Sequence, residues 1–115
     1  MLCTWSNEQA IREIYLKPFE ICVKEGKAKA VMSSFNYIGT RWAGGSEELC
    51  NTVLRDEWGF QGFVLTDYFG VYGYMNSDQG IRNGTDAMLV AYDTETNHVK
   101  DQKSATGVEA MRSGL

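Results

Sequence analysis

Apolar side chains recur at helical spacing over residues 6–26, as at Ile11, Ile14 and Phe19. This period indicates a helix with one apolar face. Gly26 predicts where the helix ends, because glycine favours the position just past a helix C-terminus.

The start and the middle of this first helix carry two local signals. Ser6 is followed three residues later by Gln9, a capping-box arrangement in which both side chains satisfy free amides of the first turn. Pro18 lacks an N–H, so we expect a kink or a break near Lys17.

A second helix is predicted over residues 46–59. Ser46 is a favoured N-cap residue, and Glu47 and Glu48 lie at the positive end of the helix dipole. Gly59 predicts its end. A shorter helix is expected over residues 77–83, and a weakly helical tail over residues 105–112.

Three short apolar runs have the length of strands. They are residues 30–33, residues 62–65, which lead into Thr66 and Asp67, and residues 86–92. Helices and strands therefore alternate along the chain, which predicts parallel strands with crossover helices. The strands show no in–out alternation, so we expect both faces of the sheet to be covered.

An open doubly wound sheet and a (β/α)8 barrel both fit this α/β pattern. In both folds, functional groups collect at the carboxyl ends of the strands, which is where Asp67 falls. A barrel needs about 250 residues, whereas this chain has 115. Three strands leave two open edges, so we expect an incomplete fragment of a larger domain that is poorly stable alone.

Composition narrows the range of partners. The net charge of −4 and the lack of a basic cluster argue against nucleic acid or an anionic membrane surface. No signal peptide is visible, no apolar run approaches the ~18 residues of a membrane span, and the compartment stays unknown. Cys3, Cys22 and Cys50 are widely spaced and are read as free thiols, with no metal site or cofactor. Asn83–Thr85 fits the glycosylation pattern, to which we give no weight.

Asp67 has three possible roles on chemical grounds. It could cap the following turn by accepting backbone N–H groups two residues on. A nucleotide site, suggested by Asp67 to Gly70, would also need a complete phosphate loop, and the chain lacks one. A glycosidase needs a carboxylate at the anomeric carbon beside aromatic faces for the sugar ring. The aromatic residues expected near this rim are Phe35, Tyr37, Trp42, Tyr68, Phe69, Tyr72 and Tyr74.

Four stretches together carry a resemblance to a known family. They are REIYLKPFE, AVMSSFNYIG, VLRDEWGFQGFVLTDY and IRNGTDAML, and they run in order over residues 5–92. They resemble the later part of the catalytic barrel of glycoside hydrolase family 3, whose members are mostly β-glucosidases and related exo-acting enzymes. The resemblance implies a partial (β/α)8 TIM barrel, with about strands six to eight and their helices. Residues 1–115 would form this single segment, with residues 93–115 as a loop and weak helical tail.

By this resemblance, Asp67 is the nucleophile of a retaining β-glycosidase that hydrolyses O-glycosidic bonds. Phe35, Tyr68 and Trp42 are the implied substrate-binding residues, and the substrate is a small glycoside or oligosaccharide. Asp86 is expected to brace the barrel end rather than react. The general acid/base, the sugar-binding residues upstream and the rest of the barrel would come from the parent polypeptide, so the isolated chain should be inactive.

Three positions depart from the family pattern. Tyr68 replaces the usual tryptophan after the nucleophile, Thr66 replaces the usual serine before it, and Phe35 replaces a tyrosine whose hydroxyl would touch the nucleophile. The alternative that remains is a non-catalytic carbohydrate-binding or structural α/β piece in which Asp67 caps a turn.

Overall fold

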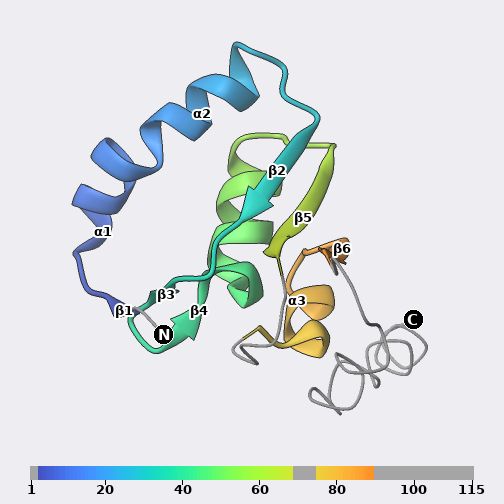
Figure 1. The fold of residues 1–115 in the computed structure, drawn as a ribbon. Helices are drawn as coiled ribbons and strands as arrows, with labels where there is room; N and C mark the ends of the chain where they lie inside the picture. Colours follow the sequence, from blue (N-terminus) through green and yellow to red (C-terminus); the bar gives the residue numbers. More distant parts are fainter. Residues whose placement is uncertain (1–2, 69–74, 90–115) are drawn as a thin grey trace.

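The computed structural model describes residues 3–68 and 75–89 of the chain (Figure 1). Its elements in chain order are β1 (Cys3–Thr4), α1 (Glu8–Ala10), η1 (Ile11–Tyr15), α2 (Lys17–Lys24), β2 (Ala30–Ser33), β3 (Tyr37–Ile38), β4 (Arg41–Trp42), η2 (Ala43–Gly45), η3 (Glu48–Glu57), β5 (Phe63–Tyr68), α3 (Ser77–Arg82) and β6 (Ala87–Leu89). Within the strand predicted over residues 86–92, the structure has β6, while residues 90–92 and the tail over residues 93–115 lie outside the described residues.

The main sheet has the order β2-β5-β6 with parallel pairing throughout. β2 has the bounds predicted from the sequence, and its residues 30–33 pair in register with residues 63–66 of β5. β5 runs further than predicted, because it continues through Asp67 to Tyr68. The carboxylate therefore lies within the end of the central strand rather than after it.

The first helical segment begins and breaks at identifiable residues. Asn7, not the predicted Ser6, is the N-cap, and its Oδ1 accepts the Ala10 N–H at 2.8 Å. The capping box is therefore wrong, because Gln9 donates to Glu13 instead. The predicted break is confirmed: Leu16 separates η1 from α2, and Pro18 lies in the first turn of α2, where a missing N–H costs little.

The second helix, η3, follows the predicted signals. The Ser46 hydroxyl accepts the Leu49 N–H at 3.3 Å, and Gly59 has a φ of +69°, which ends the helix in the left-handed region. Short-range pairing that we did not predict precedes it. β3 and β4 form a hairpin around Gly39, whose φ of +60° suits a two-residue turn, and β1 pairs parallel to β3.

One face of the main sheet is covered, as Figure 1 shows with η3 beside β2 and β5. Val64 of β5, Leu54 of η3 and Val23 of α2 form one buried cluster with Phe60. The expectation that both faces are covered is wrong for the described chain. Met32 is 60% exposed and Phe63 is 48% exposed, because no described element packs over these strand positions.

Arg55 and Asp86 tie η3 to the amino-terminal end of the sheet. Asp86 Oδ2 accepts from the Arg55 guanidinium at 2.8 Å and from the Val64 N–H at 2.7 Å. Arg55 also donates to the carbonyls of Gly62 and Gly84. Asp86 therefore joins a helix to two strands at the end of the sheet away from Asp67.

Replacing Asp86 with alanine should destabilise the chain by about 1–3 kcal/mol, because the Val64 N–H and the Arg55 guanidinium both lose their shared acceptor. Urea unfolding followed by tryptophan fluorescence measures this free energy. Asp56→Ala is the matched control, since Asp56 is an exposed carboxylate on the same helix as Arg55. Equal midpoints for the two variants would contradict the bracing role.

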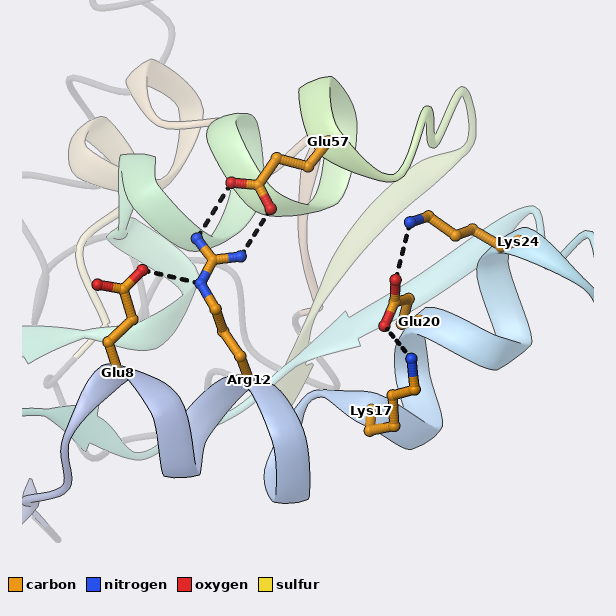
Figure 2. Close-up of polar contacts among 6 residues, drawn as sticks. All are labelled: Glu8, Arg12, Lys17, Glu20, Lys24 and Glu57. Atoms are coloured by element: carbon orange, nitrogen blue, oxygen red, sulfur yellow. Dashed lines mark hydrogen bonds and ion pairs between the residues drawn. The ribbon is translucent and has the colours of Figure 1, made fainter.

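Two ion-pair groups lie along the first helical segment (Figure 2). Arg12 makes a two-pronged contact with Glu57 of η3, at 2.6 and 3.0 Å, and a third contact with Glu8 at 2.8 Å. Glu20 accepts from Lys17 and Lys24, both at 2.8 Å. The hydrogen bonds from Lys17 and then Lys24 lower the pKa of Glu20 to about 2, against the opposing effect of desolvation.

Acid should therefore weaken α2. The pKa of Glu20 is lower in the folded than in the unfolded chain, so its stabilising contribution is present above its ordinary pKa of about 4.3 and is lost as the pH falls toward 2. We expect circular dichroism at 222 nm to lose helical signal over this range, and Glu20→Gln to reduce the loss. Glu47→Gln, at an exposed site before η3, should behave as wild type. An unchanged acid transition in Glu20→Gln would refute the assignment.

Candidate functional site

Asp67 is the next-to-last residue of β5, at the carboxyl end of the central strand. Its side chain is half-buried, and its Oδ1 accepts the backbone N–H of Tyr68 at 2.6 Å. This amide belongs to β5 itself, while the amide two residues on, which a turn cap would use, is that of Phe69 and lies outside the described residues. The carboxylate is therefore oriented by its own strand, at the edge where α/β folds place their chemistry.

Phe35 and Tyr68 lie at the ends of neighbouring parallel strands. Ser33 pairs with Thr66, so the chain leaves β2 beside Asp67 and Tyr68. Phe35 is half-buried and packs against a cluster formed by Trp42 and Met75. Tyr68 is also half-buried. The structure thus brings Phe35 to the same end of the sheet as Asp67, while the predicted rim residues Phe69, Tyr72 and Tyr74 lie outside the described residues.

Trp42 does not offer the exposed stacking face that we expected. Its side chain is 1% exposed, and its indole N–H donates to the Ser34 carbonyl at 2.8 Å. Gly44 and Gly80 lie against the ring, and a side chain at Gly44 would collide with it. Trp42 therefore packs beneath the strand-end loop and holds Ser34, the residue before Phe35.

Two residues of the Asn83–Thr85 stretch secure η2, which directly follows Trp42 in the chain. Thr85 is 3% exposed, and its hydroxyl donates to the Gly44 carbonyl at 2.7 Å. The Asn83 amide donates to the Gly45 carbonyl at 2.9 Å. The sequence analysis missed this role; the signal available was a pair of short polar residues immediately before a strand, which often bond to nearby backbone.

Among residues 3–68 and 75–89, two hollows lie between the first helical segment and the elements that follow it, and neither has Asp67 in its lining. One is apolar, has a volume of about 410 Å³ and includes Tyr15, Phe19, Val31 and Leu54 in its walls. The other, of about 320 Å³, is lined by all the residues of Figure 2 except Glu8, together with Glu13 and Trp58.

Two titratable side chains near the core have shifted pKa values. Burial raises the pKa of the Cys50 thiol and of the Tyr37 hydroxyl. Cys3, Cys22 and Cys50 are all free thiols. Among residues 3–68 and 75–89, no three His, Cys, Asp or Glu side chains gather as metal ligands. No helix in these two ranges has the length and apolar character to cross a membrane.

Comparison with known proteins gives a consistent set of relatives. The chain is 45% identical over 64 residues to a β-glucosidase of Ruminococcus albus, covering 56% of the chain and 7% of that protein. It is 38% identical over 102 residues to β-glucosidase A of Butyrivibrio fibrisolvens, covering 84% of the chain and 12% of that protein. The chain thus spans about a tenth of the length of these curated relatives.

The fold leads to the same group of proteins. β-Glucosidase 3B of Thermotoga neapolitana, solved in complex with glycerol, superposes with a TM-score of 0.80 at 34% identity, over 98% of this chain and 15% of that one. The family model described as the glycosyl hydrolase family 3 N terminal domain matches residues 1–109. Because this model matches almost the whole chain, the chain belongs to glycosyl hydrolase family 3.

Proposed function

We propose that this chain is the nucleophile-bearing part of a retaining, exo-acting β-glucosidase, and that Asp67 is the nucleophile. The observation that carries the proposal is the position of Asp67, at the carboxyl end of the central strand and inside the region that the family model matches. The contact from the Tyr68 N–H holds one carboxylate oxygen at 2.6 Å. We assign the attack on the anomeric carbon to the other oxygen, Oδ2.

The reaction proceeds in two steps. Asp67 displaces the leaving group and forms a glycosyl ester, and water then hydrolyses this ester. A second carboxyl group about 5–5.5 Å away protonates the leaving oxygen and later activates the water. We place this acid/base outside the chain, in the rest of the parent polypeptide.

Phe35 and Tyr68 are the proposed aromatic contacts of the sugar. Trp42 supports them from beneath, since its buried ring and its hydrogen bond to Ser34 secure the loop that carries Phe35. Phe35 has no hydroxyl to share with the nucleophile, so we assign the orientation of Asp67 to the Tyr68 N–H.

We further propose that β2, β5 and β6 are strands six to eight of a (β/α)8 barrel, and that residues 1–115 form one barrel segment. Two features support this. Within the described ranges, β2 and β6 are the outer strands of the main sheet with no further strand beside them, and the sheet exposes Met32 and Phe63 on the face away from η3. Residues on that face would meet the barrel interior, which side chains fill.

Trapping the glycosyl ester tests the nucleophile assignment. In a chimera, this chain replaces the matching segment of the Thermotoga neapolitana β-glucosidase 3B, and a 2-fluoro β-glucoside slows hydrolysis of the ester. Peptide mapping should find the mass tag on Asp67. A tag on another residue of an active chimera would leave Asp67 as a structural residue, as in the non-catalytic alternative.

A further inference from the structure

The pairing register between β5 and β6 shifts by one residue near Asp67. Leu65 pairs with Ala87 and Tyr68 pairs with Leu89, so three steps along β5 correspond to two along β6. Thr66 and Asp67 therefore lie opposite the single residue Met88. This is a β-bulge, a feature that redirects a side chain and is enriched beside active sites.

The Thr66 hydroxyl replaces the ladder contact that the bulge interrupts. Thr66 is 0% exposed, and its Oγ1 accepts the Leu89 N–H at 2.9 Å. On the other side of β5, Thr66 is in register with Ser33 of β2. Thr66 is thus held between both neighbouring strands, while the next residue, Asp67, carries the carboxylate.

The orientation of Asp67 depends on the same bulge. In a regular strand the amides of successive residues point to opposite sides, and the Tyr68 N–H would be available to one neighbouring strand. Here the Tyr68 N–H donates to Asp67 Oδ1. The carboxylate is therefore fixed by an amide of the bulged segment, and that segment is held to β6 by Thr66.

We propose that Thr66 is a positioning residue, whose buried hydroxyl maintains the bulge that aims the Asp67 carboxylate at the sugar. This inference rests on the proposed nucleophile. It also gives a role to the hydroxyl of Thr66 that requires no contact with substrate.

The test compares variants that differ at Thr66 by a single group, in the chimera described above. Thr66→Val keeps the shape and removes the acceptor. Thr66→Ser keeps the acceptor and removes a methyl group, and Thr66→Ala removes both, so the serine and alanine pair isolates the hydroxyl if the valine variant fails to fold. The readouts are kcat, KM and hydrogen exchange of the peptide containing Leu89.

Thr66→Val should lower kcat by about 10- to 100-fold, because a small misplacement of a reacting group has an effect of this size. KM should change little, and the peptide containing Leu89 should exchange faster. Thr66→Ser should retain most of kcat, and Thr66→Ala should not.

Equal kcat values for Thr66→Ser and Thr66→Ala, or for Thr66→Val and wild type, would overturn the positioning role. An Asp67→Gly chimera distinguishes failure of the positioning role of Thr66 from failure of the proposed function. If Asp67→Gly is inactive while the Thr66 variants have the wild-type kcat, only the proposed positioning role of Thr66 is rejected. If Asp67→Gly remains active, the nucleophile assignment itself is wrong.

Discussion

Asp67→Gly in the active chimera should lower kcat by about 10⁴-fold or more, as expected when the residue that forms the covalent bond is removed. Sugar binding should persist, because the proposed contacts of Phe35 and Tyr68 are left in place. Steady-state kinetics with an aryl β-glucoside measures the loss, and glucose binding by calorimetry measures what remains. Asp56→Gly is the control for a lost carboxylate, because Asp56 is exposed on η3.

Rescue of activity by azide distinguishes the loss of a nucleophile from damage to the fold. In Asp67→Gly the small anion can enter the space of the lost carboxylate, form the bond from nitrogen to the anomeric carbon and release the aglycone. Attack from the side of Asp67 would give the α-glycosyl azide. Formation of this product is expected, whereas turnover of Asp67→Gly at the wild-type rate without azide would refute the assignment.

Trp42→Ala should destabilise the chain by about 3–5 kcal/mol, the usual cost of removing a large aromatic side chain from a core. Trp42 is 1% exposed and forms a buried cluster with Met75. A loss of this size is a large part of the 5–15 kcal/mol that stabilises a typical domain. Urea unfolding monitored by circular dichroism gives the free energy of unfolding.

Trp5 provides a matched control, since it is 74% exposed. Trp5→Ala should change the free energy of unfolding by no more than about 0.5 kcal/mol. Trp42→Phe keeps most of the ring and removes the N–H that donates to the Ser34 carbonyl. Its loss of stability should therefore lie between those of Trp42→Ala and Trp5→Ala. Equal stability of the Trp42→Ala and Trp5→Ala variants would mean that the ring of Trp42 is not part of the core.

Signals close together in the sequence predicted much of the fold. The bounds of β2, the break before Pro18, the Ser46 cap and the end at Gly59 all depend on the chemistry of a few adjacent residues. Alternation of helices and strands predicted the parallel pairing of β2, β5 and β6. The placement of Asp67 at the end of a strand followed from the same pattern.

Two of the corrections have different causes: the N-cap of the first helix depends on which of two neighbouring residues takes the role, and the burial of Trp42 depends on distant contacts. Ser6 and Asn7 are both good caps, and the geometry of the first turn decides for Asn7. Trp42 follows a strand in an aromatic-rich stretch, which favoured an exposed stacking face. Its burial depends on Met75, Gly44 and Gly80, and the last of these lies 38 residues away in the sequence.

The sequence by itself determined the fold class, the strand that carries Asp67 and the family resemblance, because periodicity, caps and a continuous motif are local properties. Only the tertiary structure decided that Trp42 is a core residue, that Arg55 and Asp86 join η3 to the sheet, and that Thr66 meets the Leu89 amide in a bulge. These features depend on strand register and on contacts between distant segments. One residue of register shift redirects every side chain that follows, and local propensity carries no information about such a shift.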